Sequence, residues 1–160
     1  MTGQGHSRRV VRIDLEDAAS LRQSAEAEQE RAVAIFDLIE ENEFAPEIEH
    51  PGPYHLVLAI AENRLVFDIR DTADAPVYKF ILSLSPLRRI IKEYFDVCES
   101  YYAAIKSSSL SHIEAIDMGR RGLHNEGAEL LRERLRQHVE MDIDTARRLF
   151  TLVCVLHIRA

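Results

Sequence analysis

The sequence predicts an α+β fold, in which a small antiparallel β-sheet (a three-strand meander plus an N-terminal strand) packs against about four helices. Between residues 54 and 82, apolar side chains alternate along three short segments, and the loops joining them are too short for a crossover helix. Between residues 25 and 45 and after residue 85, apolar residues recur every three or four positions, the spacing of one helix face. This order of elements predicts helices on one face of the sheet.

The N-terminal part is expected to hold a strand and a helix. Residues 1–8 are expected to form a disordered tail, with one α+β domain over residues 9–160. The alternation from Val10 to Leu15 predicts the strand. Ser24 is the predicted N-cap of a helix of about 18 residues that ends before Pro46.

Acidic residues are concentrated in one segment. The chain carries 20 basic and 27 acidic residues, a net charge of −7, and residues 25–50 hold nine of the acids against one arginine. We interpret this segment as a solvated helix face with the loop after it. Its charge repels phosphate backbones and disfavours nucleic acid as a partner, but it offers a surface on which a protein partner can dock.

The meander strands are expected over residues 54–60, 64–70 and 77–82. Glu62-Asn63 lies between the first two as a hairpin turn, where asparagine tolerates a left-handed conformation. The preceding residues 46–53, PEIEHPGP, are expected to form a stiff turn region that cannot be helical.

Three helices are expected to complete the chain. Ser85-Pro86 predicts the start of the first, as an N-cap followed by proline. Ser111 to Glu114 fits a capping box, which starts a second helix running towards Gln137. Asp144 is the predicted cap of the last helix, and the apolar stretch from Leu149 to Leu156 predicts that this helix is buried.

The composition excludes several classes of protein. Two cysteines cannot build a disulfide framework or a four-thiolate zinc site. No apolar run approaches the ~20 residues of a membrane span, and the polar N-terminus lacks the apolar segment of a signal peptide. We therefore expect a soluble cytoplasmic protein with no membrane partner, metal or cofactor.

Four long runs of sequence resemble a known family. They are residues 30–44 (ERAVAIFDLIEENEF), 81–102 (ILSLSPLRRIIKEYFDVCESYY), 113–126 (IEAIDMGRRGLHNE) and 144–157 (DTARRLFTLVCVLH). The chain resembles an uncharacterised, mainly alphaproteobacterial protein family of the UPF type. The resemblance implies a bacterial intracellular protein, but it supplies no activity and no catalytic residues.

The most unusual segment, residues 117–127, contains three glycines, Gly119, Gly122 and Gly127. Each lowers helix stability by about 0.8–1 kcal/mol relative to alanine. Close packing at a helix crossing explains Gly119 and Gly127 if the segment is helical, since both then lie near the apolar stripe. A helix break, or backbone exposed to a ligand, are the alternatives.

The same segment carries the candidate site. Asp117, Arg121 and His124 are spaced to share one helix face, and Arg120 lies four residues before His124. Such a row can bind an anion or orient a histidine that moves protons near neutral pH. An ordinary salt bridge beside a histidine is the alternative. Asn125 and Glu126 complete the set of candidate ligand-binding residues.

Paired arginines recur in each C-terminal helix, at Arg88-Arg89, Arg120-Arg121 and Arg147-Arg148. If they converge, they form a basic pocket for an anionic metabolite or for the acidic face of a partner. The alternative is local pairing, for which the candidates are Arg89 with Glu93 or Asp96, Arg120 with Glu126, and Arg148 with Asp144.

Two classes of function therefore remain open. One is a binding or interaction module that docks a protein partner or a second copy of itself, since no catalytic motif is found and Cys98 and Cys154 lie on apolar helix faces. The other is a protein that binds a small anion, or an enzyme, with His124 as acid/base and Arg120 and Arg121 as anion ligands. A concave pocket lined by the arginines and His124 would favour the second.

Overall fold

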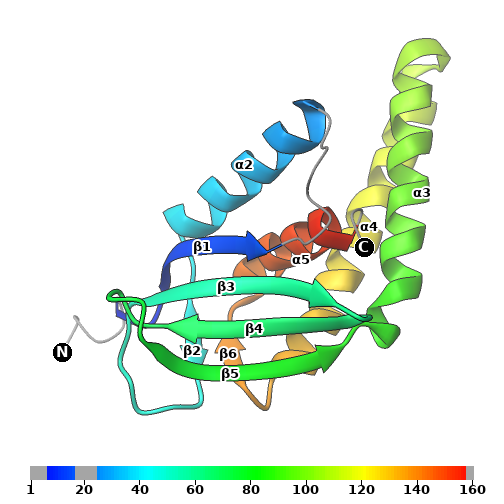
Figure 1. The fold of residues 1–160 in the computed structure, drawn as a ribbon. Coiled ribbons are helices and arrows are strands. Elements are labelled where there is room, and N and C mark those ends of the chain that lie inside the picture. Colours follow the sequence, from blue (N-terminus) through cyan, green and yellow to red (C-terminus); the bar gives the residue numbers. More distant parts are fainter. Residues whose placement is uncertain (1–6, 17–24, 158–160) are drawn as a thin grey trace.

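A computed structural model describes residues 7–16 and 25–157 and confirms the α+β fold (Figure 1). The predicted cap Ser24 and residues 1–6 of the expected tail lie outside the described residues. The elements are β1 (Val10–Glu16), α2 (Ala25–Glu40), β2 (Phe44–Pro46), β3 (Tyr54–Ala61), β4 (Arg64–Arg70), β5 (Pro76–Ser83), α3 (Ser85–Ser107), α4 (Leu110–Leu135), β6 (Val139–Met141) and α5 (Ile143–His157).

The main sheet has the strand order β1-β3-β4-β5. Strands β3, β4 and β5 form the predicted antiparallel meander, and Glu62 and Asn63 make the predicted turn with positive φ angles of 52° and 62°. The prediction of an all-antiparallel sheet is wrong at β1, which pairs with β3 in parallel. The physical reason is the connection, because the chain passes through α2 before it returns to β3 and can therefore re-enter the sheet in the same direction.

A second, two-stranded sheet was not predicted. Strand β2 pairs antiparallel with β6, so that Phe44 faces Met141 and Pro46 faces Val139. Pro46 is therefore in a strand and not in the turn region expected over residues 46–53. Arg8 fixes the start of that turn region, since its guanidinium donates to the carbonyl oxygens of Pro46 and Ile48 at 2.9 and 3.1 Å.

The helices lie on one face of the main sheet, as predicted (Figure 1). The inward-facing side chains of β3 and β4, such as Leu56, Leu58 and Phe67, are fully buried. Helix α5 runs behind the sheet, and nine of its residues are buried, which confirms the burial predicted from Leu149 to Leu156. Helices α3 and α4 pack together as a hairpin that projects beyond the sheet.

The starts of α3 and α4 lie one or two residues earlier than predicted. Ser85 is the first residue of α3 and not its N-cap, which is Leu84. The N-cap of α4 is Ser109, whose hydroxyl accepts from the backbone N–H of His112 at 3.3 Å, so the predicted cap Ser111 lies inside the helix. Both segments contain several serines, and sequence spacing alone does not decide which one the chain uses.

The predicted cap of α5 is also displaced by two residues. Asp142 accepts from the backbone N–H of Thr145 at 3.1 Å, which is the bond of an N-cap. Asp144 instead lies in the first turn and pairs with Arg147 at 2.8 Å. Two aspartates two residues apart can both cap a helix, and the short strand β6 before Asp142 fixes the choice.

Only one of the two glycines assigned to close packing has that role. A side-chain carbon at Gly127 would lie 2.7 Å from Cε2 of Phe150 and closer still to other atoms of that ring. The same explanation is wrong for Gly119, since no described atom outside its own stretch of helix comes within 4 Å of such a carbon, and the same holds for Gly122. Gly119 and Gly122 lie on the exposed side of the hairpin, and nothing in the described structure explains them.

Candidate functional site

Helices α4 and α5 approach each other closely at Gly127 and Phe150. His124 contacts Thr151 and Asn125 contacts Arg147 near this approach. The approach therefore places polar side chains of α4 beside residues 147–151 of α5, with Tyr94 of α3 against His124. Between the three helices lies a cavity of about 450 Å³, and its described lining residues are Tyr94, Arg120, Arg121, His124, Asn125 and Arg147.

The two adjacent arginines of α4 share one carboxylate. Oδ1 of Asp117 lies 2.6 Å from Arg120, and its Oδ2 lies 2.9 Å from Arg121. The hydrogen bond from Arg120, followed by the charges of both arginines, holds the pKa of Asp117 below its usual value. The ion pair between Asp117 and Arg121 is therefore formed, as the alternative of an ordinary salt bridge predicts. Arg120 also lies over the ring of Tyr101, at 4.7 Å from the centroid.

Glu126 does not join this site. The local pair of Arg120 with Glu126, named as a candidate of the alternative, is wrong, because Arg120 pairs with Asp117 and six residues of helix turn Glu126 about 120° away from Arg120. Glu126 is exposed and is not among the described residues that line the cavity.

Arg147 reaches the cavity from α5. Its Nε donates to Oδ1 of Asn125 at 2.7 Å, and its Nη1 lies 2.8 Å from Asp144. The predicted pair of Arg148 with Asp144 is wrong, because Arg147 takes that carboxylate. Arg148 points to the other side of α5 and donates to the carbonyl oxygen of Glu41 at 2.8 Å.

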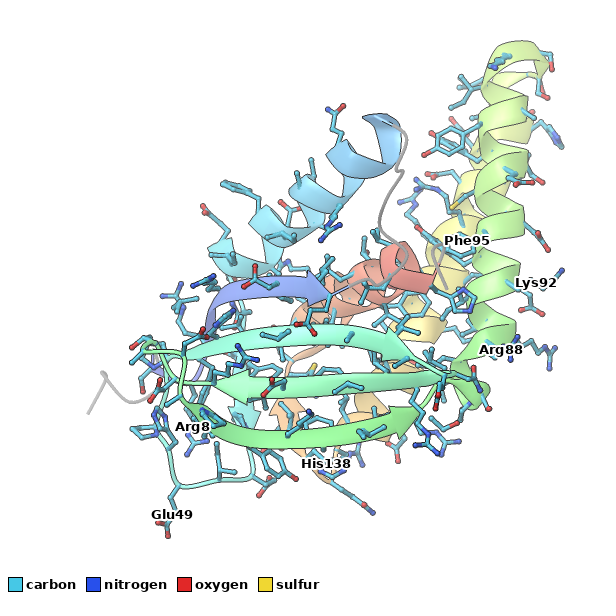
Figure 2. All side chains as sticks on the ribbon, in the orientation of Figure 1. Arg8, Glu49, Arg88, Lys92, Phe95 and His138 are labelled. Carbon is cyan, nitrogen blue, oxygen red and sulfur yellow. The ribbon has the colours of Figure 1, made fainter. Side chains whose placement is uncertain are left out.

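The third arginine pair stays apart from the cavity. Arg89 pairs with Glu93 at 3.2 Å, which confirms the local alternative, and its side chain is 89% exposed. Figure 2 shows Arg88 near the end of α3 that adjoins the sheet. Of the six paired arginines, Arg120, Arg121 and Arg147 are therefore among the described residues that line this cavity, and the other three are not.

His124 is held neutral in this cavity. Burial, followed by the charges of Arg147 and Arg120, lowers the pKa of His124 below its usual value. Nε2 of His124 lies 2.8 Å from Oγ1 of Thr151, whose hydroxyl donates to the carbonyl oxygen of Arg147 at 3.2 Å. The tautomer of His124 decides which of these two atoms donates in the bond to Thr151. The neutral imidazole has one ring nitrogen that carries a lone pair, and this nitrogen can accept a proton or a hydrogen bond.

A second cavity, of about 550 Å³, lies between α3 and α5 and was not predicted. Tyr94 and Thr151 line it together with the cysteines Cys98 and Cys154, neither of which forms a disulfide within the described residues. Cys154 is buried, as expected, whereas Cys98 is half-buried at the cavity. The residues that line this cavity from α3 belong to the helical pattern of apolar residues after residue 85. That pattern alone does not show which of these residues pack against another helix and which line a cavity.

A polar cluster on the outer face of the sheet was also missed. His55 is 4% exposed, and its two ring nitrogens each lie 2.7 Å from a carboxylate, Asp14 on β1 and Asp74 in the β4–β5 loop. Both ring nitrogens of this buried imidazole therefore have a carboxylate partner. The alternation of β3 assigns His55 to the face opposite Tyr54 and Leu56, but only the parallel register of β1 brings Asp14 to it.

The described residues contain no group of three or more histidine, cysteine or carboxylate side chains placed to hold a metal ion. No helix among the described residues has both the length and the apolar character needed to cross a membrane.

The fold and the cavity together define a small α+β protein with an arginine-lined cavity between three helices. The chain belongs to the uncharacterised protein family UPF0262, whose model matches residues 7–159. This confirms the resemblance found in the sequence.

Relatives in the family span nearly the full chain. The UPF0262 protein of Paramagnetospirillum magneticum is 54% identical over 96% of this chain and 98% of its own length. That of Maricaulis maris is 57% identical over 95% of each chain, and that of Mesorhizobium japonicum is 56% identical over 99% of each. No solved structure matches this chain significantly.

Proposed function

We propose that the protein binds a small anion in the cavity between α3, α4 and α5. The observation that carries this proposal is the convergence of three guanidinium groups, Arg120 and Arg121 from α4 and Arg147 from α5, on one cavity. Among the described residues their ion pairs involve two carboxylates, Asp117 and Asp144, which leaves one positive charge in excess.

The existing ion pairs leave donors for a ligand. A guanidinium carries five N–H donors in a planar fork, and the bonds of Arg147 to Asn125 and Asp144 use only Nε and Nη1. Arg121 pairs with Asp117 through Nη2, and its side chain is 69% exposed. The shared carboxylate of Asp117 orients the guanidinium groups of Arg120 and Arg121 before a ligand binds. This reduces the side-chain entropy that is lost when a phosphate or carboxylate binds.

The proposal is tested by isothermal titration of the protein with inorganic phosphate, succinate and a nucleoside monophosphate. We expect at least one of these anions to bind, and we expect Arg121→Gln to weaken its binding at least tenfold. Arg89→Gln is the matched control, because Arg89 also forms a helical pair four residues apart but lies far from the cavity. No binding by any of the three anions, or equal losses in both variants, would contradict the proposal.

The neutral His124 also favours acid/base chemistry as a second candidate function. A ring nitrogen with a lone pair and the lowered pKa of His124 are the properties of a general base that works at neutral pH. In this function, His124 would accept an acidic proton from the bound anion. The docking of a protein partner or of a second copy, and the cytoplasmic location, stay predictions from the sequence.

A further inference from the structure

We infer that the anion bound in this cavity carries an apolar body, and that this body lies in the second cavity between α3 and α5. The inference rests on the proposed function, because the arginine-lined cavity is its anion site. It adds the chemical class of the ligand, a monoanionic amphiphile such as a medium-chain carboxylate.

The two cavities share one lining residue and are also linked by one hydrogen bond. The ring of Tyr94 lines both of them, so a single aromatic side chain forms part of the wall of each. The hydrogen bond between His124 and Thr151 joins a residue of the first cavity to a residue of the second at 2.8 Å. The anion site and the second, apolar cavity are therefore neighbours with Tyr94 in the wall of both.

The lining of the second cavity suits an apolar body. Tyr94 and Phe95 supply aromatic rings from one turn of α3, and Tyr102 supplies a third ring about two turns further on. Cys98, Cys154 and Val155 supply sulfur and methyl groups. Figure 2 shows Phe95 on the side of α3 that faces the end of α5, and Lys92 on the outer side. The volume of about 550 Å³ falls within the roughly 300–1,000 Å³ usual for small-molecule sites.

His157 and Glu99 of this lining disfavour a second negative charge on the ligand. Burial, followed by the charge of Arg88, lowers the pKa of His157, so this histidine is neutral at pH 7. Glu99 is exposed at the edge of the cavity, and its carboxylate repels an anion. A dicarboxylate or a polyphosphate that reached from the arginines into this cavity would therefore lose affinity there.

The test is a titration of the full chain with butanoate, hexanoate and octanoate, each below its micelle concentration, and with octanol as the uncharged control. A methylene that moves from water into an apolar cavity contributes about 0.8 kcal/mol, which is roughly a fourfold change in Kd. We expect the affinity to rise towards that factor per methylene from butanoate to octanoate. Octanol is expected to bind much more weakly than octanoate.

Two pairs of variants locate the binding energy. Cys98→Met adds volume to the apolar cavity and is expected to reduce the gain with chain length, whereas Cys98→Ser keeps the size of the side chain and is expected to retain most of it. Arg121→Gln is expected to weaken all three carboxylates by a similar factor, and Arg89→Gln is expected to leave them unchanged. If a variant fails to fold, the chain-length series on the wild-type protein still tests whether the ligand has an apolar body.

The outcomes separate this inference from the proposed function. If phosphate or butanoate binds and the affinity does not rise with chain length, the apolar extension is wrong and the anion site stands. If none of the anions binds, both fail. If octanol bound as tightly as octanoate, the arginines would contribute nothing to the binding, and the inference would be wrong. Co-sedimentation with vesicles of phosphatidylglycerol, without binding of octanoate, would assign the surface to a membrane lipid and overturn the inference.

Discussion

Gly127 of α4 lies directly against the aromatic ring of Phe150 of α5, so closely that a side-chain carbon on Gly127 would overlap that ring. We expect Gly127→Ala to destabilise the protein by about 1–3 kcal/mol, because the gain in helix propensity is smaller than the strain of overpacking a filled core. Urea unfolding followed by circular dichroism measures this change. The variant should also weaken anion binding, since the same helix approach positions His124 and Arg147.

Gly119 and Gly122 are the matched controls for that prediction. Both lie in the same helix, and the described structure leaves open space where a side-chain carbon would lie. Gly119→Ala and Gly122→Ala are expected to stabilise the protein by about 0.5–1 kcal/mol each, the difference in helix propensity. If all three variants had the same effect, the packing of Gly127 on Phe150 would not be the cause.

The meander and the α4 part of the site could be predicted from the sequence because their signals are local. Alternation decides which face of β4 is buried, and helix spacing alone places Arg120 beside His124. Strands β2 and β6 could not be predicted, because three residues show no periodicity and each strand exists only through a partner about 95 residues away. The sequence also could not separate Arg147 from Arg148, since the rotation of α5 against α4 decides which arginine reaches the cavity.

The pH dependence of stability provides a test of the state of His124. Because the pKa of His124 is lowered in the folded protein, the unfolded chain binds a proton first as the pH falls. His124 therefore reduces stability as the pH drops through its unfolded value of about 6.5 towards its folded value. We expect His124→Gln, which does not titrate, to lose less stability than wild type between pH 7.5 and pH 5.5 in urea unfolding.

A bound anion should reverse part of this effect. Phosphate on Arg120 and Arg147 would shield His124 from the charges that lower its pKa, so binding would take up a fraction of a proton. Titrations in two buffers of different ionisation enthalpy measure that uptake, and wild type should show it where His124→Gln does not. Equal proton uptake by both proteins would place the anion away from His124.

His55 is expected to stabilise the outer face of the sheet through its two carboxylate partners. A glutamine amide cannot reach carboxylates on opposite edges of an imidazole, so His55→Gln should lose at least one charged hydrogen bond and about 1–2 kcal/mol of stability. The hydrogen bond from His55, with Arg70 as the second partner, lowers the pKa of Asp74. The stability that Asp74 contributes is therefore fully present above its unfolded pKa of about 3.8. It is lost as the pH falls through the lower pKa that Asp74 has in the folded protein.

The measurement is the difference in unfolding free energy between wild type and His55→Gln at pH 6 and near pH 3. This difference should shrink at the lower pH as Asp74 is protonated. Asp96→Asn serves as the control, because Asp96 forms an exposed helical pair with Lys92 at 3.4 Å and should change stability by less than about 0.5 kcal/mol. A difference that does not change with pH would show that His55 stabilises the sheet by packing alone.

Asp117 competes with an anionic ligand for the same guanidinium groups. Its two carboxylate oxygens lie 2.6 and 2.9 Å from Arg120 and Arg121, so its negative charge repels an anion that binds the remaining donors of these guanidinium groups. Asp117→Asn removes one negative charge beside the cavity but keeps the size of the side chain and its carbonyl oxygen. We expect this variant to bind phosphate several-fold more tightly than wild type and to lose more of that affinity when salt is added.

Glu93→Gln is the control for this prediction, because Glu93 also pairs with an arginine on a helix but is not among the described residues that line the cavity. It removes the same charge from the whole molecule, so any gain in affinity that it shares with Asp117→Asn reflects net charge and not the site. If Asp117→Asn weakened phosphate binding instead, the carboxylate would act mainly by orienting the two guanidinium forks. In that case the guanidinium groups of Arg120 and Arg121 would need Asp117 to hold them in position for the anion. The same titrations would then show a loss of phosphate affinity in Asp117→Asn and not in Glu93→Gln.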